Sequence, residues 1–317
     1  MNYTIGVDLG GSHVACGCVS IDGEITGYSE RPVDRTASPE KIISEDVCGV
    51  IRDCLEKNAA VRDGIKGIGI GIPGRTDSKN GICVFAPNLG WRDVNVSEPV
   101  SREFGLPVFI LNDARAMAVG EKHFGNGKGC DNFVCIAVGT GVGGGIVAGG
   151  RLLLGANEAA GEIGHITVEP EGPVCGCGNH GCAEALASRL GIVKRAENAI
   201  DAGAETILAR ENLSSKDIYD AAVKGDRLSL KIWEDTGIYL GRAIANIATT
   251  VNPERILFSG RVSNAWEFFL PALKKELKER ARMVPVEKME FMKARFEDNA
   301  GIVGNAGRAF ECLGLLK

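Results

Sequence analysis

The stretch Thr4-Ile-Gly-Val-Asp-Leu-Gly-Gly-Ser-His-Val-Ala15 is a short apolar strand, a glycine turn and the start of a second strand. The chain repeats this arrangement about 130 residues later, in Val134-Cys-Ile-Ala-Val-Gly-Thr-Gly-Val-Gly-Gly-Gly-Ile-Val147. A repeated β-unit at this separation predicts two related α/β domains that face one another across a cleft. The chain has 317 residues, enough for two domains of ordinary size.

Hydrophobic patterns around these two units predict further strands and helices. Strands are expected at 3–9, 14–20, 24–31, 68–72, 108–111 and 255–259, and another strand begins at Phe133. Helices are expected at 38–58, 113–122, 186–224, 227–250, 264–282 and 301–312. The predicted fold class is therefore α/β.

Two glycine turns offer backbone N–H groups that can bind anions. Gly139-Thr-Gly-Val-Gly-Gly144 fits G-x-G-x-x-G, but a strand pattern follows where a dinucleotide-binding fold needs a helix. No Gly-Lys-Ser/Thr of a P-loop occurs. This turn and Gly10-Gly11-Ser12 are either ordinary hairpin turns or anion-binding nests. Two of them on paired domains, with Asp8 placed to orient a hydrated magnesium ion, favour a nucleoside-triphosphate site.

A carboxylate follows directly after the strand at 108–111. Asn112-Asp113 also begins a helix there, and Asn or Asp at this position can cap the helix N-terminus. Ligands of open α/β sheets bind at the ends of strands, where a carboxylate could accept the proton of an attacking hydroxyl. The sequence leaves both interpretations open.

The segment Cys175-Gly-Cys-Gly-Asn-His-Gly-Cys182-Ala-Glu184 places three thiols within eight residues, with His165 ten residues upstream. Thiolates and imidazole are the ligands of tetrahedral zinc, so the set predicts a closed structural site. The alternatives are three buried free thiols or one disulfide. A zinc-bound His165 would present its other ring nitrogen to a partner, and Glu162 would share its face in a helical turn. Together with Glu184 this suits a polyhydroxylated ligand, whereas His180 is interpreted as a surface residue.

The composition is that of a soluble globular protein, with 44% hydrophobic and 24% charged residues. The formal net charge of −5 argues against a nucleic-acid partner. No apolar run approaches the roughly 18 residues of a membrane span, and the N-terminus lacks the basic start of a signal peptide. Most of the 11 cysteines stand singly in apolar segments, which is typical of reduced thiols and predicts a cytoplasmic protein.

These motifs together resemble the ROK family of sugar kinases and repressors, and the match extends over essentially the whole chain in order. They are Asp8-Leu-Gly-Gly-Ser12, Asn112-Asp113, Gly139-Thr-Gly-Val-Gly-Gly-Gly145, Gly161-Glu-Ile-Gly-His165 and Cys175-x-Cys-Gly-x-x-Gly-Cys-x-Glu184. The resemblance implies a two-domain actin/hexokinase-like (ribonuclease H-like) fold. Residues 1–120 would form the N-terminal domain, completed by the helix in 301–317. Residues 121–300 would form the C-terminal domain, with the zinc loop and most of the nucleotide site.

The resemblance also implies roles for individual residues, with Asp113 as the catalytic base. The implied substrate-binding residues are Gly74, Asn88, Asn112, Asp113, Glu162, His165 and Glu184. The implied ATP and Mg²⁺ site contains Asp8, Gly10, Gly11, Ser12, Gly139, Thr140, Gly141 and Gly260. The implied ligands of a structural Zn²⁺ are His165, Cys175, Cys177 and Cys182.

Two positions depart from the pattern of the family. Ser12 stands where threonine is usual, which keeps the hydroxyl group. Ser259-Gly260-Arg261 stands where Gly-Gly-Gly is frequent, so Arg261 is expected to affect the nucleotide pocket. The choice between ATP and polyphosphate as donor therefore stays open.

Ala86-Pro-Asn88-Leu-Gly-Trp91 is similar to the Pro-Asn-Leu-x-Trp stretch of the glucokinase branch. It implies ATP-dependent phosphorylation of glucose to glucose 6-phosphate, with N-acetylmannosamine, N-acetylglucosamine, fructose or allose as alternative acceptors. A repressor is disfavoured, because that branch carries a helix-turn-helix before the first strand, which begins here by Thr4. A non-catalytic sugar-sensing protein would have no use for Asp113. The resemblance further implies a homodimer or homotetramer, while the charge and the lack of long apolar runs predict neither nucleic acid nor membrane as a partner.

Overall fold

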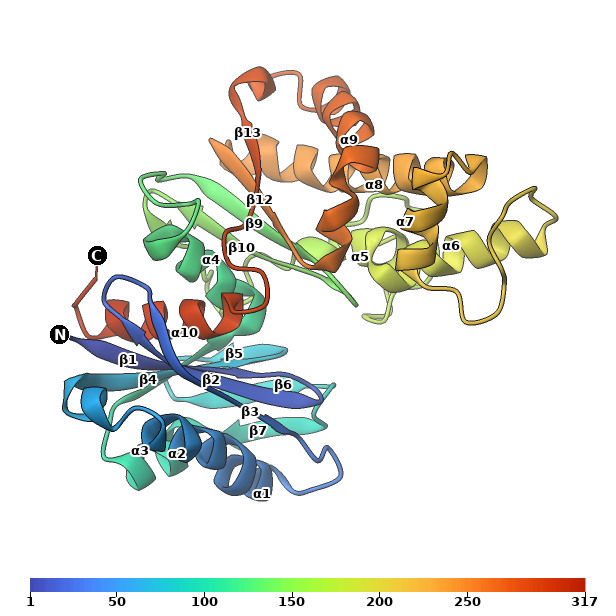
Figure 1. Ribbon diagram of the computed structural model, residues 1–317. Helices are drawn as coiled ribbons and strands as arrows, with labels where there is room; N and C mark the ends of the chain where they lie inside the picture. The colour runs from blue at the N-terminus through green and yellow to red at the C-terminus, as the bar shows by residue number, and fades with distance from the viewer. Residues whose placement is uncertain (317) are drawn as a thin grey trace. The chain divides into compact units, whose positions relative to one another are not determined.

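The computed structural model describes residues 1–316, which divide into two compact units (Figure 1). Unit 1 comprises Met1–Asp131, Gly145–Gly161 and the chain from Ala294 onward. Unit 2 comprises Asn132–Gly144 and Glu162–Lys293. Each unit is therefore assembled from segments that lie far apart in the sequence.

Runs of two to four strands and runs of helices follow one another along the chain, and strands and helices alternate singly in only part of it. The strands are β1 (Tyr3–Leu9), β2 (His13–Ser20), β3 (Ile25–Pro32), β4 (Ile65–Ile72), β5 (Arg75–Asp77), β6 (Ile82–Ala86), β7 (Trp91–Asn95), β8 (Val108–Asn112), β9 (Phe133–Val138), β10 (Val142–Ala148), β11 (Arg151–Leu152), β12 (Arg255–Ser259) and β13 (Glu290–Lys293). The α-helices are α1 (Pro39–Lys41), α2 (Cys48–Glu56), α3 (Ser97–Phe104), α4 (Asp113–Phe124), α5 (Ala183–Ala187), α6 (Arg189–Asp201), α7 (Ser215–Val223), α8 (Arg227–Val251), α9 (Trp266–Arg280) and α10 (Ala300–Cys312). A π-helical turn (Ile42–Val47) joins α1 to α2, and 3-10 turns occur at Ala59–Gly64, Ile163–His165, Arg261–Ala265 and Val286–Lys288.

Unit 1 is built on a five-stranded sheet of order β3-β2-β1-β4-β8. β1 is antiparallel to β2 and parallel to β4, which is parallel to β8. Alternate side chains of β1 point to opposite faces, as the period of a strand requires. Ile5 and Val7 pack with Val50 and Ile51 of α2 in the core on one face, and α10 covers the other face (Figure 1).

The backbone of α10 lies unusually close to the sheet and to α4. A Cβ atom on Gly6 of β1 or Gly69 of β4 would collide with a backbone carbonyl of α10. Gly304 of α10 has the same relation to the carbonyl of Ala116 in α4. Asn305, which is buried, donates a hydrogen bond of 2.8 Å to the Val7 carbonyl oxygen. The C-terminal helix is therefore an integral layer of the unit that contains the N-terminus.

A small antiparallel sheet of order β5-β6-β7 also belongs to unit 1. Its buried residues Cys83, Ala86 and Trp91 join the core that contains Ile5 and Val7. These strands, which are only three to five residues long, are not predicted by the hydrophobic pattern of residues 75–95. Such short segments contain too few alternations to establish a strand period.

The second five-stranded sheet has the order β11-β10-β9-β12-β13. If the strands of each sheet are counted in chain order from one to five, both sheets have the order 3-2-1-4-5. β12 is parallel to β9 and to β13. The predicted internal repeat and the α/β fold class are therefore confirmed. In unit 2 the long helix α8 packs closely on α9, where Gly237 contacts the Phe269 carbonyl. No helix within residues 1–316 combines the length and apolarity needed to cross a membrane.

Two expectations differ from the structure. The helical pattern expected at 186–224 is three helices, α5, α6 and α7, with a break at 202–214 where Gly203 adopts a φ of 87°. Residues 121–131, 145–161 and 294–300 cluster with unit 1, whereas the expected boundaries put them in the second domain. The physical reason is packing on α4, where Gly145 lies against Ala118.

Gly304→Ala is expected to destabilise the protein, because a Cβ at this position meets a backbone carbonyl that cannot move independently. The predicted loss of unfolding free energy is about 1–3 kcal/mol, the usual range for overpacking. The matched control is Gly307→Ala in the same helix, where the nearest atoms are the side chains of Phe124 and Val119 at 3.3 Å. Both variants gain helix propensity, so equal stabilities in thermal and urea unfolding would contradict the packing argument.

Candidate active site and metal centre

In unit 1, the carboxyl ends of three parallel strands lie at one edge of the sheet. Asp8 of β1 pairs with Gly71 of β4, and Ile72 of β4 pairs with Asn112 of β8. Asp113 follows directly after β8. This register brings together residues that are about 100 positions apart in sequence, at the edge where open α/β sheets bind their ligands.

Asn112 and Asp113 divide two tasks between them. The Asn112 side chain caps α4 by accepting a hydrogen bond of 3.1 Å from the Arg115 backbone N–H. Asp113 is the first residue of the helix, and its Oδ1 accepts bonds from the Ala114 N–H at 2.8 Å and from Asn112 Nδ2 at 3.0 Å. Asn112 is therefore the cap of α4, and Asp113, which also accepts one N–H of the first turn, places a carboxylate at the carboxyl end of β8.

Gly74 and Asn88 lie in the loops beside this edge. Gly74 has a φ of 95°, and a Cβ there would collide with the Phe85 carbonyl oxygen. Asn112 Nδ2 donates a bond of 2.9 Å to the Gly74 carbonyl oxygen. Asn88 is exposed in the turn between β6 and β7, with its Cβ 3.8 Å from the position of a Cβ on Gly11. The predicted residues Gly11, Gly74, Asn88 and Asn112 therefore belong to one neighbourhood.

The two carboxylates at the sheet edge influence each other. Burial is the larger cause that raises the pKa of Asp8 from 3.8 to about 6, and the negative charge of Asp113 is the second cause. The Asp8 carboxylate also packs against Gly301 in the first turn of α10. Holding two like charges here costs folding free energy that a bound cation can offset. The chemistry of this pair therefore fits a divalent cation held next to Asp8.

In unit 2, a tight loop carries the cysteines. Short bridges pair Thr167 with Cys182 and Val174 with His180. The Cys175 N–H donates to the Asn179 carbonyl oxygen at 2.7 Å, and Gly178 donates back to the Cys175 carbonyl oxygen at 2.9 Å. Gly178 has a φ of 89°, which L side chains rarely adopt. These turns bring the three thiols of the loop close to one another.

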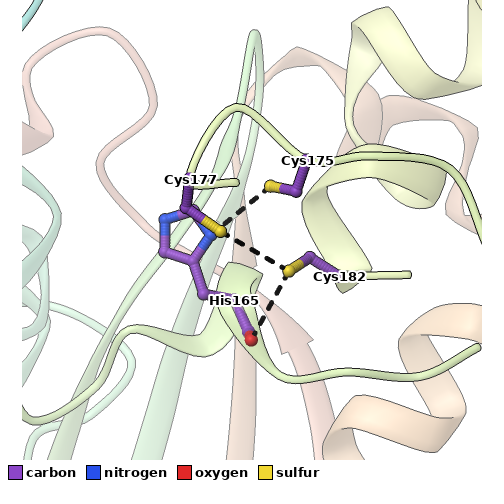
Figure 2. A group of neighbouring side chains, drawn as sticks. All are labelled: His165, Cys175, Cys177 and Cys182. Carbon is purple, nitrogen blue, oxygen red and sulfur yellow. Dashed lines mark hydrogen bonds between the residues drawn. The ribbon is translucent and has the colours of Figure 1, made fainter. Parts of the chain in front are cut away.

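Four donor atoms gather inside this loop (Figure 2). One atom each from His165, Cys175, Cys177 and Cys182 lies within 4.8 Å of the others. The sulfurs of Cys177 and Cys182 are 3.8 Å apart, and Cys175 Sγ lies 3.7 Å from His165 Nδ1. The set can hold a metal ion. His180 is exposed and lies outside it, as the sequence analysis expected.

Glu184 connects the cysteine loop to the second glycine turn. It lies in the first turn of α5, directly after Cys182 and Ala183. Its Oε2 accepts a bond of 3.0 Å from the Val142 N–H, and a Cβ on Gly141 would collide with the same oxygen. Its Oε1 lies 3.8 Å from Cys175 Sγ. The Glu184 carboxylate therefore contacts both the glycine turn at 139–141 and the cysteine loop.

The remaining predicted residues of unit 2 lie at its sheet edge or in the segment before the metal cluster. Gly260 follows β12 with a φ of 82° and packs against the Val138 carbonyl at the end of β9, so it lies beside Gly139. Thr140 and Arg261 are exposed. Glu162 is exposed and precedes a single 3-10 turn, and the His165 N–H donates to its carbonyl oxygen at 3.1 Å.

Glu158, Ser78 and Arg115 lie near the unit 1 site and have no role predicted from the sequence. Glu158 accepts hydrogen bonds from the Ser78 N–H at 2.9 Å and from the Ser78 hydroxyl at 2.5 Å. Arg115, which is buried, donates through Nε to the Ala160 carbonyl oxygen at 2.8 Å. These partners are 80 and 45 residues apart. Pairs that lie so far apart have no local sequence signal. The one available hint is Arg115 itself, a charged residue among the apolar residues of the first turns of α4.

Asp8→Asn is expected to stabilise the protein at high pH. The folded chain holds the Asp8 proton up to about pH 6, whereas an ordinary Asp releases it near 3.8. The folded state therefore binds more protons between these values, so this residue's contribution to stability falls as the pH rises through the window. The variant should melt higher than wild type at pH 8, and the gain should shrink toward pH 4.

Thermal unfolding between pH 4 and 8 measures this effect. Asp22→Asn, an exposed change of the same net charge, is the control. Equal or lower stability of Asp8→Asn at pH 8 would contradict the electrostatic argument.

The chain is similar to known proteins over nearly its whole length. A glucokinase of Halalkalibacterium halodurans is 37% identical over 308 residues, which cover 95% of this chain and 93% of that protein. The structure of a ROK family glucokinase from Streptomyces griseus, in complex with glucose and AMPPNP, matches 98% of this chain and 100% of that one, with a TM-score of 0.81 and 32% identity. A ROK family transcriptional regulator, a homologue of the E. coli MLC protein, matches 99% of this chain and 79% of its own, with a TM-score of 0.89 and 31% identity. The sequence model of the ROK family matches residues 4–310, and the chain belongs to the ROK family.

Proposed function

We propose that this protein is an ATP-dependent hexose kinase that phosphorylates glucose at its 6-hydroxyl. The observation that carries the proposal is the position of the Asp113 carboxylate, directly after β8 at the carboxyl ends of the parallel strands, where Asn112 caps α4. Further support comes from the full-length similarity to glucokinases at 37% identity. The complex of the Streptomyces griseus glucokinase with glucose and AMPPNP supports the same pair of ligands.

On the acceptor side, Asp113 accepts the proton of the attacking sugar hydroxyl. Proteins that catalyse phosphoryl transfer mainly position the reactants and neutralise charge, and a carboxylate takes the proton of the nucleophile. Asn112 holds Asp113 through the 3.0 Å bond to Oδ1 and also fixes the loop at Gly74. The residues of unit 1 proposed to bind sugar hydroxyls are Asn112, Asn88 and Gly74. Those proposed for unit 2 are Glu162, His165 and Glu184.

On the donor side, backbone N–H groups bind the phosphates. The turns at 10–12 and 139–141 act as anion-binding nests, and Gly260 borders the adenosine. Asp8 orients the magnesium ion that accompanies ATP. When bound, that ion neutralises charge on the phosphates. The raised pKa of Asp8, caused by burial and by Asp113, supports a cation there because a cation favours the ionised carboxylate.

The cysteine loop binds a structural zinc ion through His165, Cys175, Cys177 and Cys182. Metal–sulfur distances of about 2.3 Å in a tetrahedron separate two sulfurs by about 3.8 Å. The Cys177–Cys182 separation of 3.8 Å agrees with that value. When bound, zinc supplies a rigid cross-link for the loop. The loop in turn holds Glu184, whose Oε2 binds the Val142 N–H.

A sugar-responsive regulator is the second candidate, because the regulator with a TM-score of 0.89 shares this fold. Fold similarity alone does not separate the two functions. Asp113 favours the kinase, because a protein that only senses a sugar has no use for a proton acceptor at the sugar hydroxyl.

A coupled assay of ADP release over a panel of hexoses and amino sugars tests the proposal. Glucose is expected to give the highest kcat/KM, and an N-acetylated sugar at least about tenfold better would identify an amino-sugar kinase instead. Asp113→Asn keeps the shape of the side chain and removes the proton acceptor. Its kcat should fall at least about 10²-fold, the lower range for general-base catalysis.

Sugar affinity of Asp113→Asn, measured by calorimetry, should change little, because the amide still hydrogen-bonds the hydroxyl. Its melting temperature should also stay close to that of wild type, because Asn112 rather than Asp113 caps α4. A folded variant with normal turnover would exclude Asp113 from the mechanism.

Elemental analysis is expected to find about one zinc ion per chain, as four ligands make one site. Cys182→Ala should lose both zinc and activity, because the loop that holds Glu184 loses a cross-link. Cys312→Ala, at an exposed cysteine outside the cluster, is the control and should keep both. A fully active, zinc-free protein would contradict the ligand assignment.

A further inference from the structure

Unit 1 contains a closed ring in which hydrogen bonds and short backbone segments together connect three loops. The carbonyl oxygen of Gly74 accepts a bond from Asn112 Nδ2, and Asn112 Oδ1 accepts one from the Arg115 N–H. Arg115 Nε then donates to the Ala160 carbonyl oxygen at 2.8 Å. Two residues before Ala160, Glu158 binds Ser78, and the chain returns through β5 to Gly74.

Glu158 holds an unfavourable backbone conformation in this ring. Its φ is 53°, in the left-handed region that L residues other than Asn and Asp rarely adopt. The side chain accounts for this conformation. Its two oxygens accept from the Ser78 hydroxyl and N–H, and the Thr76 hydroxyl adds a longer bond of 3.4 Å. The contacts with β5 and the turn after it therefore hold the loop against its local preference.

Arg115 holds the same loop from the other side. It lies in the first turn of α4, two residues after Asp113, and its side chain is 1% exposed. A buried guanidinium needs hydrogen-bond acceptors, and the Ala160 carbonyl oxygen accepts from Nε. The bond to the Ala160 carbonyl thereby fixes the backbone two residues before Glu162.

We propose that Glu158 and Arg115 are positioning residues of the hexose site. They fix the segment that leads into Glu162 to the loop after Gly74 and to the first turn of the helix that begins with Asp113. This inference rests on the proposed hexose-kinase function. Neither residue contacts the reacting atoms in this account. Each acts through the backbone of segments that carry the proposed sugar ligands.

Glu158→Gly is the most direct test, because glycine removes the side-chain bonds and accepts a φ of 53° without strain. The variant should fold normally but hold its loop loosely. We expect the kcat/KM for glucose to fall at least about tenfold, since small misplacements of substrate-binding groups cost up to about 100-fold. The KM for ATP and the melting temperature should stay close to wild type.

Two further variants identify the cause. Glu158→Gln keeps an oxygen that accepts from Ser78, so it should recover most of the lost kcat/KM. Ser78→Ala removes the hydroxyl partner, and its effect should not add to that of Glu158→Gly in the double variant. Asn212→Gly is the matched control, because Asn212 is exposed and also has a φ of 53°.

Native kinetics for glucose in Glu158→Gly would overturn the proposal. So would an equal loss for glucose and ATP together with a lower melting temperature, which indicates a purely structural role. If the wild-type protein phosphorylates no hexose, the proposed function fails, and calorimetric binding of glucose tests the ring alone. Weaker glucose binding by Glu158→Gly than by wild type would then support it. Equal binding, or no binding by wild type, would overturn it.

Discussion

The close approach of α10 to β1, β4 and α4 is the contact on which the unit 1 site depends. Backbone meets backbone here, because Gly6, Gly69 and Gly304 have no Cβ to keep the elements apart. This packing fixes the position of α4, and therefore of Asp113, relative to the sheet. It also brings Gly301 against the Asp8 carboxylate. The resulting burial, together with the charge of Asp113, raises the pKa of Asp8 to about 6. Tight packing thus creates a carboxylate that a cation would stabilise.

In unit 2 the side-chain carboxylate of Glu184 has the corresponding role of connecting two segments. Glu184 follows Cys182 at the start of a five-residue helix, which is too short to be stable by itself. The cysteine loop on one side and the Val142 N–H on the other hold it in place. A metal bound by the loop would therefore influence the glycine turn at 139–141 through this side chain. That coupling explains why a structural metal belongs to the proposed mechanism without contacting the reacting atoms.

Both units use loops after parallel strands for the proposed ligand contacts, and both hold these loops with polar side chains. In unit 1 the ring through Asn112, Arg115 and Glu158 includes a residue with unfavourable backbone geometry. Glu158 keeps this geometry because its carboxylate has fixed donors on Ser78. Such a ring restrains several segments at once, so the loss of one bond weakens the restraint on the other segments as well. The loops are thereby held ready for a ligand before it binds.

The sequence by itself determined the α/β class, the internal repeat, most strands and helices, and the spacing of the four side chains that could hold a metal ion. These features depend on local periodicity and on residues a few positions apart, so short segments contain the information. Only the tertiary structure decided that 145–161 packs with unit 1 and that β5, β6 and β7 form a separate sheet. It also revealed the bonds of Glu158 to Ser78 and of Arg115 to Ala160. These contacts join residues 45 to 80 positions apart, and no local pattern specifies which distant partner a side chain will meet.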